Sequence, residues 1–446
     1  MRVRLVVLNF NGGDHVVRCL DHLRALAWPA DELELVVVDN ASTDGSDHVI
    51  ADRFPEVQLR RRARNDGFPA NNDALVDLEG IDYVGLVNND AFVEPDYLAP
   101  LVDALEADPG LGAVSPLILF APRFVDLVIE APATVPGRGD ERALGVLVRG
   151  LRVDGGDRWR DASFVEGSYG PELVAGGTVT WTGARAVLRV PVEVGAVGPW
   201  RVELLVSSFE PRAARFDGGG DPVEATVGPV PRWVTVEVAG EPYDVVNNAG
   251  NVVFDDGYGA DRGFGSSELD AFAEPIDVFA WSGGAVLLRP AYLADVGLFH
   301  RPFFLYYEDT DLSWRGRARG WRHRFVPGSR VRHLHAASTV EESPRFRYYT
   351  ERNRLLMLIR NAPAWMVRRE LARYLVGTWR TVEGDVLRAL RGRRCPNPRP
   401  AWRRIRALAG VLRLLPAELP ERRRLRRRQV VADRDLLAEL TPRAGS

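Results

Sequence analysis

Short apolar runs alternate with amphipathic stretches along the first ninety residues of the chain. The apolar runs predict strands at 3–8, 33–38, 57–59 and 83–87, and the stretches with helical periodicity predict helices at 15–26, 47–53 and 70–78. Strands that alternate strictly with helices form parallel sheets. The sequence therefore predicts an α/β fold for this part of the chain.

The predicted strands end in polar side chains. Asn9, Asp39, Asn65 and Asp90 each follow a different strand, and ligands of open α/β sheets bind beyond these carboxyl ends. Helix capping explains Ser42, but it does not explain Asp39 or Asp90, which come several residues before the next helix. An acid at such a position can hydrogen-bond a base or ribose, or hold a divalent cation against a diphosphate.

A second feature is an acidic cluster, with Glu308, Asp309 and Asp311 directly after the aromatic and aliphatic run 303–307. Like charges held this close raise one another's pKa and reduce stability. The cluster therefore indicates a site that handles protons or a cation, although a solvated acidic turn would explain these three residues equally well. The choice between the two depends on the other motifs of the chain.

Five segments, taken together and in this order, resemble family 2 glycosyltransferases of the GT-A fold, of the rhamnosyltransferase-like, bacterial cell-envelope type. The segments are 6–12, 37–46, 65–72, 87–90 and 307–315. The resemblance implies a GT-A nucleotide-diphospho-sugar transferase fold and inverting transfer of a sugar from a nucleoside diphosphate donor, with Mg²⁺ or Mn²⁺ as cofactor. It covers residues 1 to about 120 and 245 to about 340.

The resemblance also implies roles in nucleotide binding. Asp39 would contact the base, and Asn9, Asn65, Gly67 and Asn88 would lie near the nucleotide. Because Asp39 would read a pyrimidine without resolving its 5-methyl group, UDP-sugars and dTDP-sugars both remain open as donors.

The metal would be held by Asp90, which matches the last acid of the family's Asp-x-Asp motif. Asn88 stands where many members carry the first acid, which removes one charge, although an Asn carbonyl can still bind a cation directly or through water. The late histidine of the family matches His333, with His335 as the alternative. A buried structural histidine is the other reading of either residue.

By the same resemblance, Asp309 would be the catalytic base, with Glu308 and Asp311 beside it. The base removes a proton from an acceptor hydroxyl while that oxygen attacks the anomeric carbon. Trp281, Gly283 and Gly284 would lie on the acceptor side. Paired glycines allow close approach of the backbone and a Trp face suits a sugar ring, whereas a tight turn with a core Trp is the alternative.

The pattern changes after residue 122, where short alternating runs occur without helical periodicity. They predict an inserted antiparallel β-sandwich at 123–243 between a nucleotide-binding half at 1–122 and an acceptor half at 244–340. Its tryptophans either bind glycan or fill its core, and core is favoured because large aromatics are usually mostly buried. These residues are Trp159, Trp181, Trp200 and Trp233.

A basic C-terminal helical region is predicted at 341–446, where 26 Arg stand against 11 Asp and Glu. Basic amphipathic helices bind anionic membrane surfaces, so peripheral attachment to the inner face of the plasma membrane is one expectation. Packing on the catalytic domain or on a second subunit is the alternative. Nucleic acid is not expected, because residues 1–340 hold 32 Arg against 50 Asp and Glu.

Length and composition agree with a large enzyme. The 446 residues, 46% of them hydrophobic, predict two or three domains. Cys19 and Cys395 are too few for a disulfide framework or a metal motif. The chain shows neither a secretion signal nor an apolar run of about 18 residues, so a cytoplasmic location is expected.

The sequence thus predicts an inverting glycosyltransferase that uses a UDP- or dTDP-sugar and a cell-envelope glycan or lipid-linked acceptor. A non-catalytic glycan-binding protein with a decayed GT-A core is the alternative, supported only by Asn88. A nucleotidyltransferase would need a basic, Gly-rich loop after the first strand, and residues 9–14 contain no basic side chain.

Overall fold

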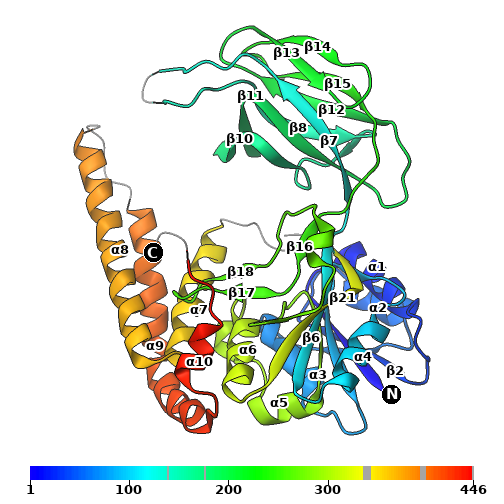
Figure 1. The fold of residues 1–446 in the computed structure, drawn as a ribbon, viewed down its shortest axis with the longest axis vertical. Helices are drawn as coiled ribbons and strands as arrows, with labels where there is room; N and C mark the ends of the chain where they lie inside the picture. Colours follow the sequence, from blue (N-terminus) through cyan, green and yellow to red (C-terminus); the bar gives the residue numbers. More distant parts are fainter. Residues whose placement is uncertain (138–139, 175–176, 335–342, 392–397, 444–446) are drawn as a thin grey trace. The chain divides into compact units, whose positions relative to one another are not determined.

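The computed structural model describes residues 1–137, 140–174, 177–334, 343–391 and 398–443 (Figure 1). The chain divides into two compact units. The first unit comprises Met1–Leu119 with Val246–Ser446, and the second comprises Phe120–Val245.

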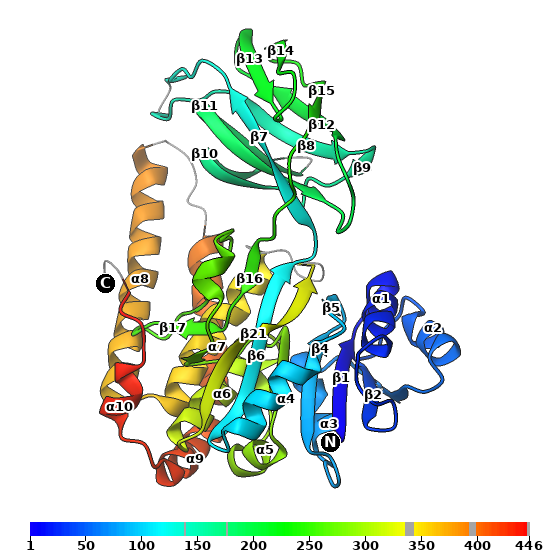
Figure 2. The same cartoon turned by 45° about the vertical axis from the view of Figure 1, so that its right-hand side comes forward.

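A mixed sheet forms the centre of the first unit (Figures 1 and 2). Within the described residues its strands are β1 Val3–Asn9, β2 Leu33–Asp39, β3 Gln58–Arg61, β4 Tyr83–Asn88, β5 Ala91–Val93, β6 Leu111–Phe120, β16 Val246–Asn248, β19 Ile276–Val278, β20 Ala285–Leu288 and β21 Arg322–His333. The main order is β19-β21-β6-β20-β4-β1-β2-β3, with β16 on β6 and β5 on β21. Strands β4, β1, β2 and β3 are parallel, which confirms the predicted α/β class.

The register of the parallel strands brings the predicted site residues together. Asn9 at the end of β1 pairs with Asp39 at the end of β2, and Leu8 pairs with Asn88 at the end of β4. Strands β1 and β2 are nearly continuous runs of buried Val and Leu, as expected for strands covered on both faces. Their polar terminal residues therefore mark the edge where the apolar core stops.

Short helices connect and cover these strands. They are α1 Gly13–Arg24, α2 Ser46–Arg53, α3 Asn72–Leu75, α4 Leu98–Ala107, α5 Pro290–Val296 and α6 Glu308–Ala318. The helix expected at 70–78 is shorter, because a 3-10 turn at Phe68–Asn71 precedes α3 and the helix ends at Leu75. A hairpin of β17 Asn251–Val253 and β18 Gly259–Asp261 lies outside the main sheet.

The C-terminal helices belong to the first unit. They are α7 Pro344–Asn361, α8 Ala364–Arg391, α9 Arg399–Arg428 and α10 Asp433–Ala438. Leu356 and Met357 of α7 share an apolar core with Phe303, Tyr307 and Trp314. Helices α8 and α9 pack on α7 through a second core. In the described part of the chain, none of the helices has the length and apolar character needed to cross a membrane.

The second unit is an antiparallel β domain. Its described strands are β7 Arg123–Glu130, β8 Leu147–Val153, β9 Gly156–Asp157, β10 Ser163–Val174, β11 Gly177–Val192, β12 Trp200–Ser207, β13 Arg212–Asp217, β14 Val223–Val227 and β15 Arg232–Val238. They form one hydrogen-bonded sheet in the main order β14-β13-β7-β11-β8-β12-β15, not the two separate sheets of a simple sandwich. The sheet folds over so that β13 and β14 approach β15, which closes a single apolar core.

The tryptophans of the second unit occupy different environments. Trp200 is buried in the core, and Trp159 packs against its edge. Trp181 stacks on the exposed Phe209 with ring centroids 4.6 Å apart. Trp233 is 39% exposed and carries the guanidinium of Arg152 on its ring. Apolar cores therefore account for Trp200 and also for Trp181, which is 7% exposed in a smaller core with Leu144 and Val179, as expected for large aromatic residues.

Candidate active site

The ends of β1 and β2 form the first part of the site. The Asn9 side-chain amide donates to Oδ1 of Asp39 at 2.9 Å and to the hydroxyl of Ser46 at 2.9 Å. The backbone amide of Ser42 donates to Oδ2 of Asp39 at 3.1 Å. A carboxylate has about four lone-pair positions, so Asp39 is fixed in orientation and still has acceptor capacity for a ligand.

The loop that carries Asn65 and Gly67 is held by a residue that the sequence reasoning missed. The side-chain amide of Asn40 donates to Oδ1 of Asn65 at 3.0 Å and to the carbonyl of Gly67 at 3.1 Å. Gly67 has φ +70°, and a Cβ there would lie 1.8 Å from the carbonyl oxygen of Phe304. Only glycine fits this close approach, which joins the predicted nucleotide loop to the segment before α6.

Asp90 and His333 come together from distant parts of the chain. His333 Nε2 lies 3.1 Å from Oδ1 of Asp90, because β21 pairs with β5 directly after Asp90. His333 Nδ1 lies 3.3 Å from Oδ1 of Asn247, a second residue that was missed. A histidine that donates from Nδ1 to such a partner keeps Nε2 available as a metal ligand. His335 lies outside the described residues.

The Asp90 and His333 pair has the donor atoms that a divalent cation needs. Two neighbouring ligands of an octahedral ion at about 2.1 Å are about 3 Å apart, which agrees with the 3.1 Å observed between Oδ1 and Nε2. Nowhere in the described residues do three or more His, Cys, Asp or Glu gather as a complete metal site. The pair therefore fits an ion that takes its remaining ligands from diphosphate oxygens and water.

A glycine turn joins the end of β4 to the acidic cluster. The backbone amide of Asn88 donates to the carbonyl of Gly284 at 3.0 Å. The amide of the preceding residue, Gly283, donates to Oδ2 of Asp309 at 3.1 Å. A Cβ on Gly283 would lie 3.3 Å from the ring of Phe68 and 3.5 Å from that Oδ2. The turn thus connects the predicted nucleotide and base residues within two peptide units.

Asp309 is the partly exposed acid of the cluster. Besides Gly283, its carboxylate accepts from the Thr310 backbone amide at 2.6 Å and from the Asn251 side-chain amide at 3.5 Å. Burial raises the pKa of Asp309, and the hydrogen bonds from Thr310 and Gly283 oppose that rise. Asp309 is consequently an oriented carboxylate with a higher proton affinity than an ordinary Asp. Asn251 and Thr310 were not found from the sequence.

Glu308 differs from its neighbour. Its side chain is buried, and within the described residues its Oε2 has no hydrogen-bond partner. Burial, together with the charge of Asp309, raises the pKa of Glu308 well above its ordinary value. Its neutral form therefore persists to a higher pH than in an ordinary glutamic acid.

Asp311 does not have the environment of a base, which corrects the expectation that it takes part in catalysis. Its side chain is 0% exposed and accepts from Arg315 Nε at 2.9 Å, Arg360 Nε at 2.8 Å and Asn361 Nδ2 at 2.8 Å. The charges of Arg360 and Arg315 outweigh burial and hold the pKa of Asp311 far below its usual range. Asp311 therefore serves to join α6 to α7.

The expectation for Trp281 is also wrong as regards its ring. Trp281 is 0% exposed and packs edge-on against Phe299, with centroids 6.1 Å apart. Its indole belongs to the apolar core under the sheet, together with Leu312 and Val286, so it cannot stack on an acceptor sugar. Its backbone carbonyl has a different use, because it accepts from the Asn251 side chain at 3.1 Å.

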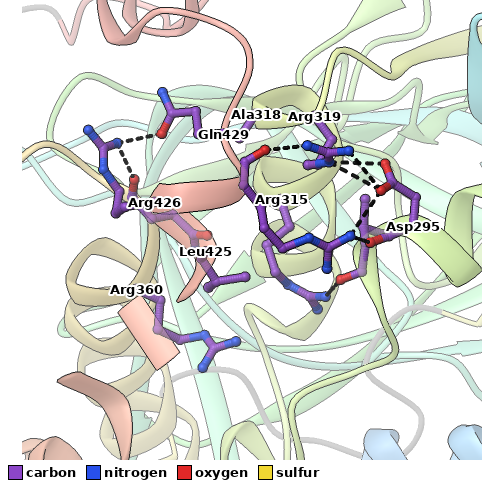
Figure 3. A pocket seen from close by; sticks show the side chains of 11 residues that line it. Asp295, Arg315, Ala318, Arg319, Arg360, Leu425, Arg426 and Gln429 are labelled. Atoms are coloured by element: carbon purple, nitrogen blue, oxygen red, sulfur yellow. Dashed lines mark hydrogen bonds and ion pairs between the residues drawn. The ribbon is translucent and has the colours of Figure 1, made fainter. Parts of the chain in front are cut away.

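A cavity between α5, α6, α7 and the end of α9 lies apart from these residues (Figure 3). Its described lining includes Asp295, Arg319, Arg426 and Arg428, and none of the predicted site residues. Arg319 and Arg428 both bond Asp295, and Arg426 bonds Asp433. These guanidinium groups are already paired within the protein, so the cavity marks where the C-terminal helix packs and not a ligand site.

The fold and the site define an α/β protein of the GT-A class, in which polar strand ends face an oriented carboxylate. Residues 5–120 match the family model of Glycosyl transferase family 2. This part of the chain is therefore similar to family 2 glycosyltransferases.

A curated relative is the poly(ribitol-phosphate) beta-glucosyltransferase of Bacillus spizizenii, which is 28% identical over 103 residues. The match covers 22% of this chain and only 16% of the length of that relative.

Three solved structures show a low overall similarity. GalNAc-T7 with UDP, GalNAc and Mn²⁺ is 14% identical, with 80% of this chain and 47% of that chain covered and a TM-score of 0.43. A mannosyltransferase from Pyrobaculum calidifontis, in complex with GDP-Man and Mn²⁺, is 14% identical over 98% and 85% of the two chains, with a TM-score of 0.41. S. aureus TarS 1–349 with UDP is 14% identical over 98% and 89%, with a TM-score of 0.38.

Proposed function

We propose that this chain is an inverting glycosyltransferase that moves a sugar from a nucleoside diphosphate to a hydroxyl of a cell-envelope glycan or lipid-linked acceptor. The observation that carries the proposal is the Gly283–Gly284 turn, which bonds Asn88 on one side and Asp309 on the other. A donor bound at the strand ends and an acceptor beside Asp309 would then meet at this turn. Proximity of this kind is a large part of catalysis in group transfer.

Asp309 is proposed as the base. The acceptor hydroxyl gives its proton to a carboxylate oxygen of Asp309 as the hydroxyl oxygen forms the bond to the anomeric carbon, and the bond to the diphosphate breaks. Gly283 and Thr310 hold the carboxylate in one orientation. The raised pKa of Asp309 supports this role, because a more basic carboxylate is a better proton acceptor at neutral pH.

Asp90 and His333 are proposed to hold Mg²⁺ or Mn²⁺, which would neutralise the charge that develops on the leaving diphosphate. Asn247 would keep the His333 ring in its orientation. Asp39, fixed by Asn9, is proposed to bind the base or ribose of the donor, and the Asn65 to Gly67 loop to close beside it. UDP and dTDP remain the proposed nucleotides.

The acceptor class is supported by the curated relative, whose name describes glucosyl transfer to poly(ribitol phosphate). The test is turnover with a panel of radiolabelled UDP- and dTDP-sugars, using a membrane extract as acceptor, with and without Mn²⁺. Metal-dependent incorporation into an envelope fraction supports the proposal. If none of the sugar nucleotides shifts the melting temperature, with or without Mn²⁺, a glycan-binding protein is favoured instead.

A further inference from the structure

Helix α8 carries an exposed apolar face, interrupted by the charged side chains of Arg368 and Glu383. Eight large apolar side chains of this 28-residue helix are 37% to 70% exposed. They are Trp365, Leu375, Val376, Trp379, Val382, Val386, Leu387 and Leu390. At about 100° per residue they fall within an arc of about 140°, along a helix about 42 Å long. We call these eight residues the α8 stripe.

The opposite face of α8 is already used for packing. Tyr374 is buried in the core formed with α7 and α9, and Val367 and Leu371 pack against the same core. Glu370 on this side is buried and pairs with Arg354 of α7 at 3.2 Å. The α8 stripe is therefore additional to the face that holds the helix on the protein. Figures 1 and 2 both place α8 at the outer edge of the first unit, away from the sheet.

Positive charge borders the α8 stripe. Arg373 and Arg380 lie seven residues apart, so they follow one another along one side of the stripe. Helix α9 repeats the combination, with Trp402 and Leu412 60% and 55% exposed beside exposed Arg406 and Arg413. Residues 364–428 together hold 19 Arg and 5 Asp or Glu. The surface thus combines aliphatic side chains, indole rings and guanidinium groups.

We propose that the α8 stripe docks on the surface of an anionic lipid bilayer, with α8 lying in the plane of the interface. Aliphatic side chains would enter the acyl boundary, Trp365 and Trp379 would sit at headgroup depth, and the bordering arginines would contact lipid phosphates. A lipid-linked acceptor would then be presented to the site from the same membrane.

Charge decides between this partner and the others. A second copy of the chain would bring the same excess of arginine face to face, and like charges across an interface oppose association. A nucleic acid would pair with the arginines but would leave the Leu and Val side chains of the α8 stripe in water. An anionic bilayer offers phosphate groups to the arginines and an acyl layer to the apolar side chains of the α8 stripe.

The experiment is flotation of the full chain with vesicles, at low and at high salt, in the absence of any sugar nucleotide. One set of vesicles is phosphatidylcholine, and the other adds phosphatidylglycerol. We expect the protein to float with the anionic vesicles, and less with neutral vesicles or at high salt. Because no transfer reaction is measured, failure here would leave the transferase proposal unaffected.

Variants separate the apolar contribution from the charged one. Trp379→Asp with Leu390→Asp should lower partition to anionic vesicles by more than about tenfold, since two large apolar side chains no longer leave water. Arg380→Glu with Arg413→Glu, at two exposed arginines, should lower it toward the level seen with neutral vesicles. The matched control is Val230→Asp, which alters a 79% exposed apolar residue outside α8 and should float like the parent.

Three results would overturn the proposal. The parent protein could fail to float with any vesicles, or the Trp379→Asp, Leu390→Asp variant could float as well as the parent. Alternatively, light scattering could show a parent dimer that this variant dissociates, which would make the α8 stripe a self-association surface. Circular dichroism and the melting temperature establish that the variants keep their fold.

Discussion

The backbone amide of Gly283 donates a hydrogen bond of 3.1 Å to Oδ2 of Asp309. This bond links the first turn of α6 to the segment that enters β20, and β20 pairs with β4 beside Asn88. The position of the candidate base is therefore set by the sheet that carries the proposed nucleotide-binding residues. A substitution that moves Asn88 should therefore also move Asp309, and the reverse, because only the Gly283–Gly284 turn lies between them.

Gly67 and Gly80 allow a matched test of the nucleotide loop. Both have φ near +70°, but a Cβ at Gly67 would meet the Phe304 carbonyl at 1.8 Å, whereas nothing lies within 4 Å at Gly80. Gly80→Ala should lower the free energy of unfolding by about 1–2 kcal/mol, the cost of left-handed backbone. Gly67→Ala should lower the free energy of unfolding by more than about 4 kcal/mol, because the backbone must move. Urea denaturation measures both, and equal losses would show that the loop is not held against Phe304.

Asp311→Asn tests the structural role of the third acid. Two buried arginines, Arg315 and Arg360, would keep their charges without the carboxylate, which should cost roughly 3–5 kcal/mol of stability. The folded pKa of Asp311 is lowered, so the stabilisation is present above its ordinary pKa and is lost as pH falls below it. The variant should therefore approach the parent in stability at acid pH. The substitution Asp435→Asn, at an exposed residue, serves as control. If Asp311→Asn leaves the free energy of unfolding unchanged, the ion-pair role of Asp311 is contradicted.

Glu308 should show the opposite pH dependence. The pKa of Glu308 in the folded state is raised above the ordinary 4.5, so the folded state keeps a proton that the unfolded state loses as pH rises above 4.5. The free energy of unfolding of the parent therefore falls over this pH range. Glu308→Gln cannot lose this proton. Its free energy of unfolding, relative to the parent, should therefore increase as pH is raised above 4.5. Denaturation across pH measures this, with the exposed Glu274→Gln as control; a pH-independent difference would mean that Glu308 titrates normally.

Asp90→Ala tests the proposed metal pair. Removal of one of two protein ligands should weaken binding of UDP or dTDP in the presence of Mn²⁺ by about 10-fold or more, with little effect when the metal is chelated. Calorimetric titration of nucleotide with and without Mn²⁺ measures the difference. The exposed Asp96→Ala is the control. Equal affinity of Asp90→Ala and the parent in Mn²⁺ would remove the metal from this position.

The sequence predicted the elements whose information is local. The apolar runs and polar ends of β1, β2 and β4 are visible in the chain, and so are the segments that resemble the family. The environment of Asp311 was not predictable, because its partner Arg360 is 49 positions away on a helix whose packing no local pattern reveals. The same holds for Trp281, whose burial depends on Phe299 and α6.

Asn247 and Asn251 were missed for a related reason. Both residues lie where the chain re-enters the first unit. There β16 pairs with β6, which brings Asn247 to His333. The inserted domain was predicted as strands, but the single folded-over sheet depends on long-range pairing that short runs do not encode.

A comparison of turnover and donor affinity in Asp309→Asn tests the assignment of Asp309 as the base. We expect turnover to fall by at least about 100-fold, because the acceptor proton has no base, while nucleotide affinity in Mn²⁺ stays within about twofold of the parent. The exposed Asp270→Asn should match the parent in both quantities. Near-normal turnover of Asp309→Asn would show that Asp309 is not the base, as would a loss of donor affinity large enough to explain the loss of turnover.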